Sequence, residues 1–161
     1  MVRKIIFLDR DGVINNNNLY YIYRKEDVVF NPGVFETLKF LFSKGYEFIV
    51  ISNQSGISKG IYSKSDVENV HEFMKSEFKK HGFDILEFYY CTHSPSVENC
   101  LCRKPETLLV EKAIARFQID VSNSYFIGDQ QRDVQTAINS GIKPILIDAN
   151  SDLTNIINKI I

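Results

Sequence analysis

Short continuous runs of apolar residues alternate along the chain with longer segments in which apolar residues recur every three or four positions. The continuous runs are typical of strands that are covered on both faces of a sheet, and the recurring pattern is typical of amphipathic helices. The sequence therefore predicts five strands, at residues 5–8, 48–51, 86–90, 125–127 and 145–147.

Four helices and a short fifth one are predicted between and after these strands. Apolar stripes at helical spacing begin at Val34, Val67, Leu109 and Val134. Three of these segments are followed by a glycine, a residue that commonly ends helices. For the second helix, Ser65 followed three positions later by Glu68 predicts a capping box. The last helix is expected from about residue 152 onward.

The regular alternation of strands and helices predicts an α/β fold, a doubly wound, Rossmann-like parallel sheet with helices on both faces. The sequence contains no repeat, linker or shift in composition that would mark a boundary, so we expect one domain over residues 1–161. In sheets of this kind ligands bind at the carboxyl ends of the strands. The residues that follow each predicted strand are therefore the first candidates for function.

The composition of the chain argues against nucleic acid and membrane as partners. The chain has 161 residues, of which 44% are hydrophobic and 24% charged, with a net charge of −1. No global positive field favours nucleic acid, and no apolar run reaches the ~20 residues that a membrane span needs. The first apolar run is interrupted by Asp9 too early for a signal peptide. We expect a cytoplasmic monomer that acts on a small molecule.

The first predicted strand ends in two carboxylates, Asp9 and Asp11. Residues two apart on an extended chain point the same way, so the two carboxylates would repel each other unless a cation lay between them. Magnesium prefers such oxygen ligands. Gly12 permits a sharp turn at this point. The alternative is a solvated pair of aspartates in a turn.

Polar residues also follow other strands. Each group alone would be an ordinary polar loop or surface pair, but together they form an ordered series of acid, hydroxyl, base and acid. A doubly wound sheet would bring the series to one rim, where hydroxyl, amide and ammonium groups suit phosphate oxygens. The groups are Ser52-Asn53-Gln54-Ser55-Gly56, Arg103-Lys104-Pro105 and Gly128-Asp129-Gln130-Gln131-Arg132-Asp133.

All three cysteines fall in one short segment together with a histidine. Cys91, His93, Cys100 and Cys102 offer three sulfur ligands and one nitrogen, a set that favours zinc in a closed tetrahedral site. Four protein ligands leave no open position for chemistry, so this zinc would be structural. It would order a segment without helical or strand periodicity that leads into Arg103 and Lys104.

In their order and spacing, the motifs at these strand ends resemble the four motifs of the haloacid dehalogenase (HAD) superfamily of phosphatases. The cysteine cluster narrows the resemblance to the histidinol-phosphatase-like branch, where the zinc is structural. The resemblance covers nearly the whole chain and implies a HAD-like fold. No long insertion separates the first two motifs, so we expect no large cap domain and an open site.

The resemblance implies roles for individual residues in a magnesium-dependent phosphatase. The nucleophile that forms an aspartyl-phosphate would be Asp9, and Asp11 would be the general acid and base. Magnesium would be held by Asp9, the backbone carbonyl of Asp11, and Asp129. Ser52 and Lys104 would hold the transferred oxygens, and Asp133 would orient Lys104 or a metal-bound water. We expect Arg10 to point away and to be structural.

Within the branch the resemblance favours a phosphatase of heptose 1,7-bisphosphate, serving lipopolysaccharide precursor synthesis, with histidinol phosphate as the alternative substrate. Gln130 stands where the heptose enzymes usually have a lysine, so a phosphate contact is missing there. The side chains of Tyr20, Tyr21 and Tyr23 could pack on a sugar. The candidate substrate-binding residues are Asn17, Asn18, Tyr20, Tyr21, Asn53, Gln54, Ser55, Arg103 and Gln130.

Two non-enzymatic interpretations remain open at this point. A receiver-like signalling module also carries a phosphorylated aspartate on a doubly wound sheet, but it lacks a built-in acid and base such as Asp11. A zinc-stabilised interaction domain would explain the cysteines and leave the strand-end carboxylates unexplained.

Overall fold

Five parallel strands form one sheet in the order β3-β2-β1-β4-β5 in the computed structural model, which describes residues 1–161. The α/β fold class expected from the sequence is confirmed. The strands are β1 (Lys4–Leu8), β2 (Tyr46–Asn53), β3 (Glu87–Cys91), β4 (Tyr125–Gly128) and β5 (Lys143–Leu146).

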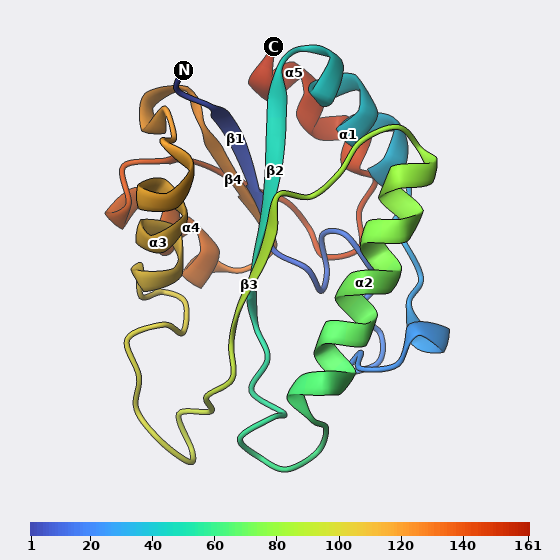
Figure 1. Ribbon diagram of the computed structural model, residues 1–161, viewed down its shortest axis with the longest axis vertical. Coiled ribbons are helices and arrows are strands. Elements are labelled where there is room, and N and C mark those ends of the chain that lie inside the picture. The colour runs from blue at the N-terminus through green and yellow to red at the C-terminus, as the bar shows by residue number, and fades with distance from the viewer.

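Helices cover both faces of this sheet, with α1 and α2 on one side and α3 and α4 on the other (Figure 1). Three short 3-10 helices, Lys25–Asp27, Val121–Asn123 and Leu153–Ile156, complete the fold. The α-helices are α1 (Val34–Ser43), α2 (Lys64–Lys80), α3 (Leu108–Phe117), α4 (Gln131–Asn139) and α5 (Ile157–Ile160).

The side chains of the central strands alternate between two apolar cores. In β1, Ile6 and Leu8 pack into the core beneath α1 and α2, whereas Ile5 and Phe7 pack into the core beneath α3 and α4. All four are fully buried. This explains the continuous apolar run, because successive strand residues point to opposite faces and both faces are covered.

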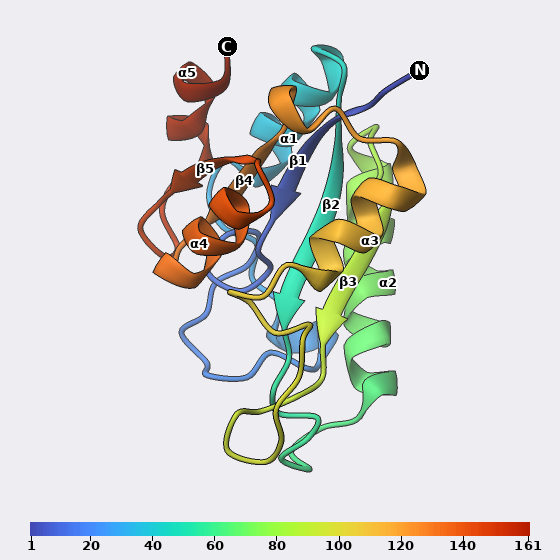
Figure 2. The ribbon, with the colours of Figure 1, turned by 90° about the vertical axis from the view of Figure 1, so that its left-hand side faces the viewer.

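The order of the strands determines where the site lies. The chain moves outward from β1 to β2 and β3, then returns to the other side of β1 with β4. This reversal leaves a crevice beyond the carboxyl ends of β1 and β4, where ligands bind in open α/β sheets. Figure 2 shows the arrows of β1, β2 and β3 pointing to the end of the molecule where the long loops gather.

Two details of the predicted pattern are wrong. The capping box of α2 is formed by Ser63 and Asp66, not by Ser65 and Glu68, because the helix begins earlier than the apolar stripe suggests. The last strand was expected to be covered on both faces, but in β5 only Ile145 is buried, since this strand lies at the edge of the sheet. None of the helices is both long and apolar enough to cross a membrane.

Candidate active site

A buried lysine links two aspartates at the carboxyl end of the sheet. The ammonium of Lys104, which is 1% exposed, lies 2.9 Å from Asp9 Oδ1 and 2.7 Å from Asp133 Oδ1. It also donates to the carbonyl of Ile51 at 2.8 Å. The two ion pairs and this hydrogen bond together fix the lysine between the ends of β1 and β2 and the start of α4.

Two hydrogen bonds between the Lys104 backbone and a side chain at the end of β2 hold Lys104 in position. The side chain of Asn53 accepts a hydrogen bond from the Lys104 backbone N–H at 3.0 Å and donates to its carbonyl at 3.3 Å. Asp133 is held in turn in the first turn of α4, where its carboxylate accepts from the backbone N–H of Gln130 at 3.1 Å. Three segments far apart in sequence thus meet at one buried cation.

Burial raises the pKa of Asp9 to about 8, since desolvation and the carboxylate of Asp133 outweigh the attraction of Lys104. One lysine cannot compensate two buried carboxylates, so the group of three carries an extra proton or requires a further cation. This charge balance favours a divalent metal beside Asp9.

The neighbouring Asp129 completes a set of oxygen ligands. Carboxylate oxygens of Asp9, Asp129 and Asp133 lie within 4.8 Å of one another. Oδ1 of Asp129 is buried and has no hydrogen-bond partner in the protein, so it is free to bind a cation. A side chain at Gly12 would collide with the carboxylate of Asp129, and the φ of +88° also favours glycine, so glycine leaves room for Asp129 at the end of β1. These oxygen donors fit magnesium.

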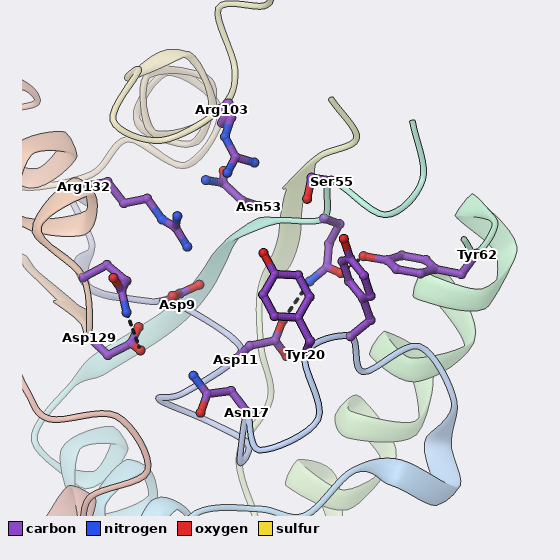
Figure 3. Close-up of a pocket in the computed structure, with 13 residues that line it drawn as sticks. Asp9, Asp11, Asn17, Tyr20, Asn53, Ser55, Tyr62, Arg103, Asp129 and Arg132 are labelled. Carbon is purple, nitrogen blue, oxygen red and sulfur yellow. Dashed lines mark hydrogen bonds between the residues drawn. The ribbon is translucent and has the colours of Figure 1, made fainter. Parts of the chain in front are cut away.

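Beside this group, Asp11 lies on the wall of an open cavity of about 330 Å³. Its carboxylate accepts hydrogen bonds from Asn15 Nδ2 at 3.0 Å and from Gln54 Nε2 at 3.2 Å. The Gln54 amide is oriented by Tyr62, whose hydroxyl donates to Gln54 Oε1 at 2.7 Å. Figure 3 shows Asp9 and Asp11 between the arginines and the rings of Tyr20 and Tyr62.

Most of the candidate residues lie around the cavity. Ser52 and Lys104 are buried and do not line the cavity. Asn18 lies outside it and contacts Asn16 and Asn150 instead. Of the residues singled out in the sequence, the cavity is lined by Asp9, Asp11, Asn17, Tyr20, Tyr21, Asn53, Gln54, Ser55, Arg103, Asp129 and Gln130.

Two lining residues, Tyr62 and Arg132, were not expected from the sequence. Arg132 extends from the first turn of α4 toward Asp9 (Figure 3) and makes no salt bridge. A cation is unfavourable at a helix N-terminus. An arginine in the first turn after Gly128-Asp129 is therefore a sequence feature that indicates a functional role. It supplies a positive charge close to the position where Gln130 provides none.

The cysteines and histidine gather at the end of β3. Cys91 Sγ lies 3.2 Å from Cys102 Sγ and 3.7 Å from Cys100 Sγ, and His93 Nδ1 lies 3.2 Å from Cys102 Sγ. All three cysteines are free thiols. The other imidazole nitrogen faces Glu98 at 3.9 Å, an arrangement that commonly supports a metal-bound histidine. The donor set fits zinc.

Two residues behind the site differ from expectation. His71, which the sequence suggested was solvated, is only 4% exposed and stacks on Phe88. Arg10 points away from the cavity as expected, but its guanidinium contacts Asp11. His81 is exposed, as expected.

Comparisons with known proteins identify the family of the chain. A model of HAD-hydrolase-like proteins matches residues 101–155. The chain is 41% identical over 145 residues to a D-glycero-beta-D-manno-heptose-1,7-bisphosphate 7-phosphatase of Helicobacter pylori, covering 89% of this chain and 83% of the relative. It is 39% identical over 147 residues to a D-glycero-alpha-D-manno-heptose-1,7-bisphosphate 7-phosphatase of Campylobacter jejuni, covering 91% and 83%.

A solved structure gives the same result. D,D-heptose 1,7-bisphosphate phosphatase from B. bronchiseptica, complexed with magnesium and phosphate, superimposes with a TM-score of 0.83 at 27% identity. The match covers 89% of this chain and 79% of that one. The extent and identity of these matches show that the chain belongs to the HAD-like phosphatases, in the family of the D-glycero-D-manno-heptose-1,7-bisphosphate 7-phosphatases.

Proposed function

We propose that this protein is a magnesium-dependent phosphomonoesterase that removes the 7-phosphate of D-glycero-D-manno-heptose 1,7-bisphosphate. The observation that carries the proposal is the buried Lys104, which aims Asp9 at a cavity whose wall also presents Asp11. A nucleophile and an acid/base at one opening are what hydrolysis through an aspartyl-phosphate requires. The family relationship supports the same substrate class.

In the proposed reaction an oxygen of Asp9 attacks phosphorus while the bond from phosphorus to the sugar oxygen breaks. Asp11 donates its proton to the departing oxygen and then accepts one from the water that hydrolyses the aspartyl-phosphate. Lys104 holds Asp9 in place through the first step. Asp9, the backbone carbonyl of Asp11 and Asp129 would hold magnesium, which would supply the positive charge that lets a carboxylate approach a phosphate dianion.

The two arginines on one side of the cavity favour a bisphosphate over histidinol phosphate as the substrate. Arg103 and Arg132 line the cavity, and neither forms a salt bridge within the protein. Unpaired guanidinium groups bind phosphate strongly, whereas they would repel the amine of histidinol. A second phosphate is therefore a better partner for this side of the cavity.

Phosphate release from heptose 1,7-bisphosphate, heptose 7-phosphate and histidinol phosphate tests the proposal. We expect multiple turnover with magnesium and the highest kcat/KM for the bisphosphate. Arg132→Ala should lower kcat/KM about 10-fold for both heptose phosphates, since Arg132 points toward Asp9 and the phosphate that is transferred (Figure 3). Arg103→Ala should lower it mainly for the bisphosphate, since Arg103 lies farther from Asp9. Faster hydrolysis of histidinol phosphate would overturn the substrate assignment, and a single turnover would favour a signalling module.

The metal-free protein should lose stability as pH rises from about 4 to about 8. Folding raises the pKa of Asp9 from 3.8 to about 8, so between these values the folded chain binds a proton that the unfolded chain has released. Thermal unfolding in EDTA measures the slope. Magnesium should raise the Tm more at pH 8 than at pH 6, because it replaces that proton. Asp9→Asn should flatten the slope, and an equal slope in the variant would contradict this origin.

We further propose that Cys91, His93, Cys100 and Cys102 hold one structural zinc ion. Elemental analysis should give one zinc per chain. Cys102→Ser should reduce zinc content and lower the Tm by roughly 10 °C, because a zinc site contributes folding free energy directly. The exposed Ser96→Ala, in the same loop, is the control. A full zinc content in Cys102→Ser would rule out this ligand set.

A further inference from the structure

The side chain of Arg10 is completely buried behind the cavity wall, and its guanidinium has a partner on every side. Nε donates to Asp11 Oδ1 at 3.1 Å, and Nη2 to Asp11 Oδ2 at 3.2 Å. Nη2 also donates to the carbonyl of Ile22 at 2.6 Å, and Nη1 lies 3.3 Å from Nε2 of His71. One buried cation thus connects the loop after β1 with helix α2.

His71 completes this arrangement from the opposite side. It is 4% exposed, stacks on Phe88 with ring centroids 4.3 Å apart, and lies edge-on to Tyr90. Burial, with the positive charge of Arg10, lowers the pKa of His71 to about 2, so the ring is neutral. A guanidinium can only donate hydrogen bonds, so His71 Nε2 accepts. The histidine is therefore a fixed acceptor behind Arg10.

Hydrogen bonds from three residues fix the orientation of the Asp11 carboxylate. The planar fork of Arg10 occupies one position on each oxygen, Asn15 a second on Oδ1, and Gln54 a second on Oδ2. A carboxylate offers about four acceptor positions, so these contacts orient the ionised form of Asp11, which gives up one of them when it carries the proton that it donates. A bidentate arginine fixes the plane of the carboxylate, which a lysine would not do. The side chain nevertheless remains 28% exposed, toward the cavity.

We propose that Arg10 is a positioning residue for catalysis, which holds Asp11 facing the leaving oxygen of the substrate and is itself held by His71. The proposal rests on the proposed phosphatase function. Proton transfer to a leaving oxygen requires the acid within hydrogen-bond distance as the bond to phosphorus breaks, and small displacements reduce the rate strongly. Neither Arg10 nor His71 lines the cavity, so both would act through Asp11.

The test compares leaving groups. A sugar alkoxide leaves poorly and needs a proton from Asp11, whereas 4-nitrophenolate leaves without one. Arg10→Lys should lower kcat/KM for heptose 1,7-bisphosphate about 100-fold and for 4-nitrophenyl phosphate less than about 5-fold. An equal loss on both substrates would overturn the proposal, because it would show a general effect on folding or phosphate binding. An unchanged rate on both would overturn it as well.

Variants of His71 keep the test decisive even if Arg10→Lys folds poorly. His71→Phe preserves the stacking but removes the acceptor, and should reduce the bisphosphate rate about 10-fold with the same selectivity between substrates. His71→Gln restores an acceptor and should recover most of that loss. His81→Phe, an exposed histidine at the end of the same helix, is the matched control and should show no effect.

A double variant separates positioning from other roles. If Arg10 acts through Asp11, Arg10→Lys should cost little more in an Asp11→Asn background, whereas independent effects would multiply. A multiplied loss would contradict the proposal. The result is independent of the natural substrate, since any alkyl phosphate that the wild-type protein hydrolyses gives the same comparison. A wrong heptose assignment would instead appear in the wild-type substrate screen.

Discussion

Asp9→Asn should abolish turnover, with kcat reduced on the order of 10⁴-fold or more, while the folded state keeps its stability. The amide cannot form the aspartyl-phosphate, and loss of a nucleophile removes the whole reaction path. The folded state does not need this negative charge, because burial already raises the pKa of Asp9 to about 8. In metal-free buffer at pH 8 we therefore expect a Tm equal to or above that of the wild type.

Activity and thermal unfolding measured on the same preparation check this expectation. Asp148→Asn makes the same chemical change at an exposed position and should affect neither quantity. Zinc content should be unchanged in both variants, because the cysteine cluster lies elsewhere. Near-normal turnover by Asp9→Asn would refute the assignment of the nucleophile, and a large fall in Tm at pH 8 would refute the account of its burial.

Lys104→Met should lower both the stability of the protein and the rate of the reaction. The change leaves the buried carboxylates of Asp9 and Asp133 facing each other without a cation. Breaking a buried ion pair in this way costs about 3–5 kcal/mol. We also expect kcat/KM to fall at least about 100-fold, because the nucleophile loses the group that positions it.

The pH dependence identifies the cause of that destabilisation. The folded Lys104→Met chain should bind protons on the two carboxylates that the unfolded chain releases, so its stability should recover as pH falls from 8 toward 5. Denaturant unfolding across this range measures the effect. Adding Asp133→Asn should restore part of the stability, and Lys112→Met on the exposed face of α3 is the control. A pH-independent loss would indicate lost packing instead.

Several features of this protein could be determined from local sequence alone. The continuous apolar runs located all five strands, because a strand buried on both faces must be apolar at successive positions. The order of the strand-end motifs, with the family they resemble, predicted the phosphatase function, and the family relationship confirms it. The sequence did not reveal that β5 is an edge strand, because an apolar run of that length looks the same in either position.

The contacts that make the site work were decided by the tertiary structure. Lys104 meets Asp9 because the loop between β3 and α3 packs against the end of β2. Arg10 meets His71 across 61 residues of sequence. Arg132 joins the cavity because α4 begins beside β1. A motif states which chemical groups are near a strand end, since that is a local property. Which charges are buried together depends on how separate segments pack, and packing depends on the whole chain at once.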